Sequence, residues 1–141
     1  MTRTMDDKKN LVLKFHQNLG KLFFAMAAID GNVRREEIDK LKEIVDQEWL
    51  LVHYDDDNLK LEAEQAIVNT FLWLYEDNEY NAEECYSSFL LFKNEHKALF
   101  TIDINKLIIK TARAIASSFS RVNKSELMLL ARLLKIYTRK Y

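Results

Sequence analysis

Proline is absent from this sequence of 141 residues, and glycine occurs only twice, at Gly20 and Gly31. Average usage is about 5% proline and about 7% glycine. Both residues make the tight turns of β-hairpins, so their scarcity argues against a sandwich, a barrel or another hairpin-rich fold. Gly20 and Gly31 also cannot be fitted to the phosphate-binding patterns G-x-G-x-x-G and G-x-x-x-x-G-K. The sequence therefore excludes a nucleotide-binding loop of either kind.

Cysteine is nearly as scarce, because Cys85 stands alone. A single cysteine excludes an internal disulfide, a C-x-x-C redox pair and a zinc site built from cysteines. We expect Cys85 to be a small buried residue rather than a nucleophile. The three histidines, His16, His53 and His96, show no metal-binding spacing. We expect His16 on the exposed side of the first helix.

An excess of charge of one sign is also lacking. The 21 basic and 22 acidic residues leave a formal net charge of −1. A nucleic-acid-binding surface would need a clear basic excess or a clustered basic face. The N-terminus does not resemble a signal peptide, and no uncharged run approaches the roughly 18 residues of a membrane span. We therefore expect a cytoplasmic protein with no transmembrane segment and no nucleic-acid partner.

The residues that are present form helical patterns throughout the chain. Hydrophobic residues make up 48% and charged residues 30% of the sequence, as in globular proteins. Apolar side chains recur at spacings of three and four residues, which predicts amphipathic helices. The predicted helices cover about residues 6–29, 34–48, 58–75 and 82–97, a segment that starts at Thr101 or Asp103, and a last segment from Asn123 to about Tyr137. We predict a single all-α domain, residues 1–141, of about six to seven helices.

Two of these segments carry further expectations. The third is apolar nearly all round between Ala66 and Tyr75, which is typical of a helix at the centre of a core. The first contains Gly20, at a cost of about 1 kcal/mol relative to alanine. Gly20 is either a tolerated surface residue or the point at which a neighbouring helix comes close.

The chain also contains an internal repeat. Shifted by 89 positions, residues 15–45 align with residues 104–134 without a gap, and six of the 31 pairs are identical. The identical pairs are Lys21/Lys110, Ala25/Ala114, Ala27/Ala116, Val33/Val122, Glu37/Glu126 and Leu41/Leu130. Both copies have a long helix, a short break, a valine and a second helix with a glutamate near its start. We interpret them as two helical hairpins that flank an inserted pair of helices, residues 58–97.

One stretch at the first hairpin turn resembles a known family. It reads Ala27-Ala28-Ile29-Asp30-Gly31-Asn32-Val33-Arg34-Arg35-Glu36-Glu37-Ile38. This is similar to the signature A-x-x-D-G-x-(apolar)-x-x-E-E-(apolar) of the TerB-like family, which is named for a tellurite-resistance protein. The same domain is found at the N-terminus of membrane-anchored DnaJ-like co-chaperones. The resemblance implies an all-helical fold of duplicated hairpins and a role in stress response.

The resemblance also implies a divalent-cation site at Asp30, Glu36 and Glu37, where oxygen ligands would suit Ca²⁺ or Mg²⁺. A purely structural turn explains the same residues. Glu36 and Glu37 would complement the positive N-terminal end of the following helix, and Asp30 would accept hydrogen bonds from amides of the turn. The sequence leaves both interpretations open.

The second copy of the repeat departs from the family motif. Phe119 and Ser120 stand where the first copy has its aspartate and glycine, while Val122 and Glu126 match Val33 and Glu37. A second, paired acidic site is therefore not expected. The residues that we expect to shape the two turns are Gly31, Val33, Val122 and Glu126.

Aromatic residues are dense in the middle of the chain, and they predict an interaction surface. Most of them are expected in the core, but the segments 58–75 and 82–97 carry apolar residues on more than one face. Aromatic side chains left exposed would suit the core of a protein interface. The candidates are Trp49, Trp73, Tyr75 and Phe92. The predicted occupant is a protein partner or a second copy in a homodimer.

Together, the patterns and the resemblance predict a non-enzymatic module of the tellurite-resistance type that acts through protein contacts. Cation binding at the Asp30–Glu37 turn is a further component of this prediction. The alternative is a dedicated metal-ion sensor whose active feature is the acidic turn.

Overall fold

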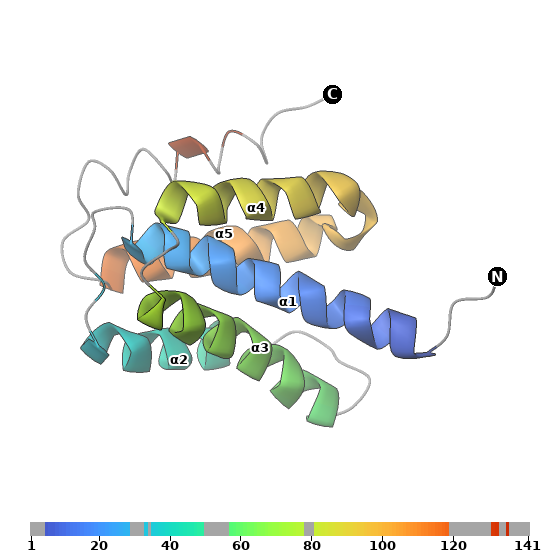
Figure 1. The fold of residues 1–141 in the computed structure, drawn as a ribbon, viewed down its shortest axis with the longest axis horizontal. Coiled ribbons are helices and arrows are strands. Elements are labelled where there is room, and N and C mark those ends of the chain that lie inside the picture. The colour runs from blue at the N-terminus through green and yellow to red at the C-terminus, as the bar shows by residue number, and fades with distance from the viewer. Residues whose placement is uncertain are drawn as a thin grey trace.

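The computed structural model describes residues 5–28, 33, 35–49, 57–77, 81–118, 131–132 and 135. These residues form the helices α1 (Met5–Ala28), α2 (Arg35–Trp49), α3 (Asp57–Glu76), α4 (Ala82–Glu95) and α5 (Ile102–Ser118), with a 3₁₀-helix η1 (Lys97–Leu99) before α5 (Figure 1). The predicted all-α class is confirmed. Five α-helices are fewer than the six to seven expected, and the last predicted helix lies mostly outside the described residues.

Side-chain caps set the start of two helices. Asn81 precedes α4, and its Oδ1 accepts a hydrogen bond from the Glu84 amide at 2.9 Å. Thr101 does the same for α5, where its Oγ1 accepts from the Ile104 amide at 3.2 Å. Such caps satisfy amides that have no partner within the helix. The sequence predicts that the fifth helix starts at Thr101 or Asp103, and in the structure Thr101 caps it.

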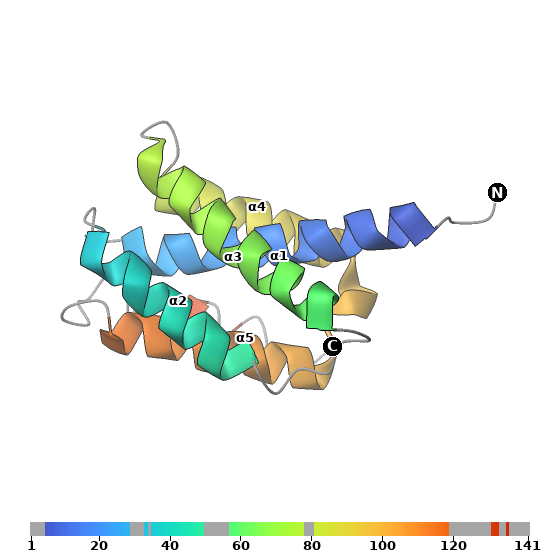
Figure 2. The same cartoon turned by 90° about the horizontal axis from the view of Figure 1, so that it is seen from below.

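The central helix is α1. It packs against α3, α4 and α5. Figure 1 shows α1 between α4 on one side and α2 and α3 on the other, and Figure 2 shows α3 crossing it. Residues 22–27 are buried without interruption. Successive residues of an α-helix point about 100° apart, so six buried in a row mean that neighbours surround the helix there.

The expectation that the third helix is central is therefore wrong. α3 packs on α1 and α2 and buries Ile67, Phe71 and Leu74. Its opposite face stays exposed and includes Trp73, half of whose surface is accessible. An apolar composition all round did not place α3 at the centre, because the helix with buried residues on all sides is α1.

Helix α3 lies directly against the backbone of α1 at Gly20. A Cβ atom built on Gly20 would lie 2.7 Å from the carbonyl oxygen of Ile67 and 2.8 Å from Cβ of Thr70. Both distances are shorter than a normal van der Waals contact, and both involve atoms close to the α3 backbone. Of the two interpretations of Gly20, the structure supports the close approach of a neighbouring helix.

The corner between α4 and α5 is held by aromatic contacts. Phe100, which follows η1, packs edge to face against Phe15 of α1 at 5.3 Å and against Phe89 of α4 at 5.9 Å between ring centroids. Each edge-to-face pair at such a distance stabilises the folded state by about 0.5–1.5 kcal/mol beyond the effect of its buried area.

No helix within the described part of the chain is both long enough and apolar enough to span a membrane.

We predict that Gly20→Ala lowers the free energy of unfolding by about 1–3 kcal/mol, the usual cost of overpacking a core. Alanine favours a helix by about 1 kcal/mol over glycine, but the added Cβ would push α3 away from α1. Denaturant titration measures the change. Lys14→Ala, at an exposed position of the same helix, is the control and should change stability by less than about 0.5 kcal/mol. A more stable Gly20→Ala variant would contradict the close packing.

Candidate functional site

The acidic turn predicted as a cation site lies largely outside the described residues. This holds for Asp30 and Gly31, and for Val122 and Glu126 of the second copy. Glu36 and Glu37 belong to the first turn of α2, but their side chains are likewise not described. Val33 is half-buried and packs against the core. Among the side chains that the structure does describe, no group of three or more His, Cys, Asp or Glu residues could hold a metal ion.

The four residues predicted for an interaction surface have different environments. Trp73 is 50% exposed, whereas Tyr75 is half-buried against the core. Phe92 is only 9% exposed and packs against His96 with 4.5 Å between ring centroids, so it belongs to the core rather than to a surface. Trp49 is the last residue of α2, and its side chain is not described. Among the three whose side chains are described, Trp73 is the exposed one.

Trp73 lies in an exposed row along α3. Gln65 and Asn69 are also exposed, and the three residues follow one another at intervals of four. Residues four apart lie on the same face of a helix, one turn above the other. We call the side chains of Gln65, Asn69 and Trp73 the α3 ridge. The polar members of this ridge were not predicted from the sequence. The signal for them was the spacing of four residues between Gln65, Asn69 and Trp73, which places all three on one face of a helix.

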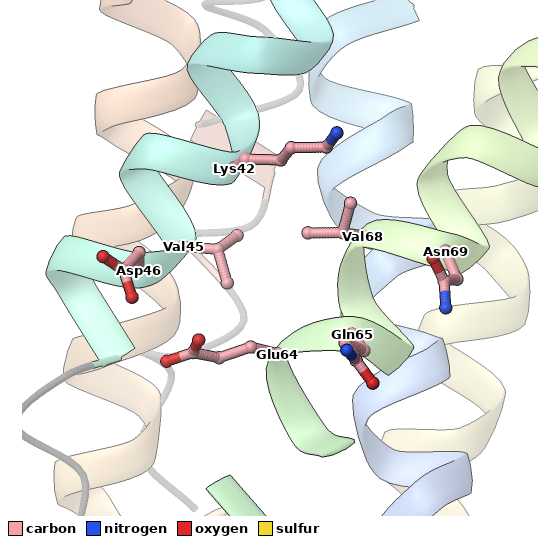
Figure 3. A pocket seen from close by; sticks show the side chains of 7 residues that line it. All are labelled: Lys42, Val45, Asp46, Glu64, Gln65, Val68 and Asn69. Atoms are coloured by element: carbon pink, nitrogen blue, oxygen red, sulfur yellow. The ribbon is translucent and has the colours of Figure 1, made fainter. Parts of the chain in front are cut away.

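One groove borders the α3 ridge on the side of α2. Its volume is about 250 Å³. The lining residues are Lys42, Val45, Asp46, Glu64, Gln65, Val68 and Asn69 (Figure 3). Val45 and Val68 point toward each other across its floor, and Asp46 lies on the α2 side. The groove therefore combines an apolar floor with a rim that includes carboxylates.

A second groove borders the α3 ridge on the side of α1. It has a volume of about 360 Å³ and is lined by Gln17, Lys21, Asn69, Thr70 and Trp73. Lys21 donates a hydrogen bond from Nζ to Oγ of Ser88 on α4 at 3.0 Å, which holds its ammonium group at the α4 edge of this groove. Asn69 lines both grooves, so the α3 ridge separates them.

The C-terminal part of the chain contacts α4 through Arg132. Its Nη1 donates to Oε1 of Glu83 at 2.7 Å, and its guanidinium lies 4.8 Å from the centroid of the Tyr86 ring. Burial raises the pKa of Tyr86, and the nearby charge of Arg132 opposes this change. The ion pair is half exposed, and such pairs contribute little to stability.

Cys85 is 2% exposed, which confirms that it is a small buried residue. Burial raises the pKa of its thiol to about 11, although the positive charge of Lys21 acts in the opposite direction. The reactive form of cysteine is the thiolate. Cys85 is therefore protonated and unreactive at neutral pH in the folded protein.

His16 is not on the surface, contrary to the expectation from the sequence. It is 3% exposed, packs edge to face on Phe15, and donates from Nδ1 to the carbonyl oxygen of Val12 at 2.8 Å. Because a carbonyl only accepts, Nδ1 carries the proton of the neutral ring. Burial lowers the pKa of His16 below its ordinary value of 6.5, and the hydrogen bond to Val12 opposes this change. A polar ring can be buried here because its hydrogen bond to Val12 forms within α1 and its face packs on Phe15.

Comparisons with known proteins give no relative. No family model matches the chain. No curated protein and no solved structure matches it either.

We predict that the buried His16 makes stability depend on pH. The unfolded chain takes up a proton below about pH 6.5 while the folded protein resists protonation, so the free energy of unfolding falls as the pH drops below 6.5 and levels off below the pKa of the folded state. Each unit of lowered pKa corresponds to about 1.4 kcal/mol. Denaturant titration at a series of pH values measures this slope.

The matched variant is His16→Gln, which keeps an amide donor in place of the ring N–H and does not titrate. Its free energy of unfolding should fall less steeply than that of the wild type between pH 6.5 and 5. The comparison uses slopes, because the substitution also changes the packing around Phe15. Equal slopes in the two proteins would show that His16 does not resist protonation.

Proposed function

We propose that this chain is a non-enzymatic, TerB-like protein of the stress-response type that acts in the cytoplasm through protein–protein contacts. The sequence of the Ala27–Ile38 stretch supports the family assignment. The all-helical fold, with a long α1 surrounded by other helices, is compatible with it. We further propose that the contact surface is the α3 ridge with its two bordering grooves.

The observation that carries the proposal is the exposed Trp73 beside a groove. A tryptophan with half of its surface in water leaves a large apolar area unburied. Tryptophan is enriched among the residues that dominate binding energy, and such residues occupy the centre of interfaces with polar groups around them. Gln65, Asn69 and Lys21 provide that polar surrounding here.

The grooves on either side of the ridge supply the second requirement of an interface. Binding residues of one partner fill depressions of the other, and flat surfaces offer few such contacts. The α2/α3 groove has an apolar floor of Val45 and Val68 (Figure 3). The α1/α3 groove has polar walls that can orient a partner by hydrogen bonds. The surface thus combines an apolar anchor, one groove with an apolar floor and a second groove with polar walls.

We predict that ligands selected for this protein from a random-peptide display library bind the α3 ridge. Trp73→Ala should weaken their binding by at least about tenfold, because it removes the apolar anchor. Fluorescence anisotropy of labelled peptides on the two proteins measures the difference.

Leu91→Ala is the control, because Leu91 is 62% exposed on α4 and lies outside both grooves. This variant should bind the selected peptides as the wild type does. Equal loss in both variants, or peptides indifferent to Trp73→Ala, would show that the α3 ridge is not the contact surface. Thermal melting of each variant separates lost contacts from lost folding.

A second component of the proposal is a divalent cation, Ca²⁺ or Mg²⁺, held by Asp30, Glu36 and Glu37. It is supported by the family resemblance and by the position of Glu36 and Glu37 in the first turn of α2. A chain whose principal role is to sense that cation is the alternative function. In the first proposal the chain acts by binding another protein, whereas in the alternative it acts by binding the cation.

We predict that Ca²⁺ or Mg²⁺ raises the melting temperature of the wild type and that Asp30→Asn abolishes this increase, because a ligand that binds the folded state stabilises it. Isothermal titration calorimetry gives the stoichiometry. Asp39→Asn, an exposed change on α2, should keep the response. If neither cation affects the wild type, the turn is structural and the sensor alternative fails.

A further inference from the structure

The groove between α1 and α3 is walled by two pairs of residues, and the members of each pair lie one helical turn apart. Gln17 and Lys21 form the wall on α1, and Asn69 and Trp73 form the wall on α3. Residues four apart share one face of a helix, so each pair lines the groove from the same side. Thr70 completes the lining. All five residues belong to helices, which hold side chains more precisely than loops do.

Among the described residues that line this groove, Lys21 alone is charged. Its Nζ donates one hydrogen bond to Oγ of Ser88 on α4 at 3.0 Å. An ammonium group has three N–H donors, so this bond fixes its position and leaves two donors for a ligand. Glu84, one turn before Ser88, does not line the groove, and its Oε1 accepts a hydrogen bond from Nδ2 of Asn81 at 3.2 Å. The groove thus presents a positive charge with no acidic residue in its described lining.

The groove on the other side of the α3 ridge has the opposite balance of charge. Its lining has two acidic residues, Asp46 and Glu64, and one basic residue, Lys42 (Figure 3). A carboxylate would be repelled by the two acidic residues there, whereas in the α1/α3 groove it would meet the ammonium group of Lys21. The α3 ridge therefore separates a groove that favours an anion from one that disfavours it.

We propose that the α1/α3 groove binds an acidic segment of the protein partner, with the carboxylate of an aspartate or glutamate on the Lys21 ammonium group and an apolar neighbour of that residue packed against Trp73. This inference rests on the proposed function, because it takes the α3 ridge as the contact surface and names the chemistry of its partner. The charge of the groove decides the sign of the partner's charge, and the indole ring decides that an apolar group stands beside it.

The other lining residues suit the same ligand. A carboxylate accepts up to about four hydrogen bonds, and Gln17, Asn69 and Thr70 each have an N–H or O–H group that can donate. Hydrogen bonds that involve a charged group are roughly twice as strong as neutral ones. Trp73, which is 50% exposed, offers apolar surface to the methylene groups of the acidic side chain and to its neighbour. The groove can therefore hold both the charged end of the side chain and the apolar part beside it.

Peptides selected for the full chain from a random-peptide display library test the proposal, because it predicts their composition. Aspartate and glutamate should be enriched among the binders relative to the unselected library. One binder is then synthesised with each acidic residue replaced in turn by the corresponding amide. At least one replacement should weaken binding to the wild type by about fivefold or more, because it removes a hydrogen bond between charged groups. Fluorescence anisotropy measures the change.

Lys21→Met tests the position of the carboxylate, because it removes the charge and keeps a long side chain. It should weaken binding of the acidic peptide by about fivefold or more, and the amide replacement in the peptide should then have no further effect, since both changes remove the same ion pair. Lys42→Met is the matched control, because it removes one positive charge from an exposed lysine of the α2/α3 groove. This variant should bind within about twofold of the wild type. Thermal melting shows whether each variant is folded.

Selected peptides without an enrichment of acidic residues would overturn the proposal, and so would acidic peptides that bind Lys21→Met as well as the wild type. Equal loss in Lys42→Met would show a response to net charge alone and would also overturn it. If these peptides still require Trp73, the α3 ridge remains the contact surface, so the proposed function stands and the acidic ligand fails. If acidic peptides require Lys21 but not Trp73, the carboxylate binds outside the groove, and both the inference and the contact surface fail.

Discussion

The close contact of α1 and α3 at Gly20 is the constraint on which the rest of the structure depends. Because Gly20 has no Cβ, the α3 backbone at Ile67 can come within a distance that no other residue allows. This contact turns Ile67, Phe71 and Leu74 into the core. A helix that buries one face against a neighbour presents its opposite face to water. The exposed row that carries Trp73 is therefore a consequence of where α1 lets α3 lie.

Three buried polar side chains are satisfied within their own helices. Among the described residues, the buried polar side chains are His16, Asn18 and Thr111. Each donates a hydrogen bond of 2.8 Å to the carbonyl four residues earlier in its own helix. A buried polar group costs little when it is hydrogen-bonded. These three bonds each lie within a single helix, so they do not themselves set how the helices are placed relative to one another.

Helix positions could be predicted from the sequence, because the spacing of apolar residues records which side of each helix is buried. The bounds of α1 to α4 agree with it to within about two residues.

How deeply each helix and side chain is buried could not be predicted from the sequence. Apolar residues all round favoured α3 as central, yet Trp73 is exposed, and the polar His16 lies in the core. Burial of a given side chain depends on neighbours distant in sequence, so Phe92 and His16 were both misplaced. The acidic turn stays a prediction, since Asp30 lies outside the described residues.

The predicted repeat gives this arrangement a further meaning. In the alignment shifted by 89 positions, Gly20 pairs with Ile109 and Phe24 pairs with Arg113. These are the positions through which α1 receives α3, since Gly20 meets Thr70 and the ring of Phe24 packs on that of Phe71 at 5.5 Å. Arg113 of α5 is exposed instead. Helices α1 and α5 therefore differ at the positions where α3 packs on α1. If both descend from one unit, the changes that admitted α3 to α1 also created the exposed row that carries Trp73.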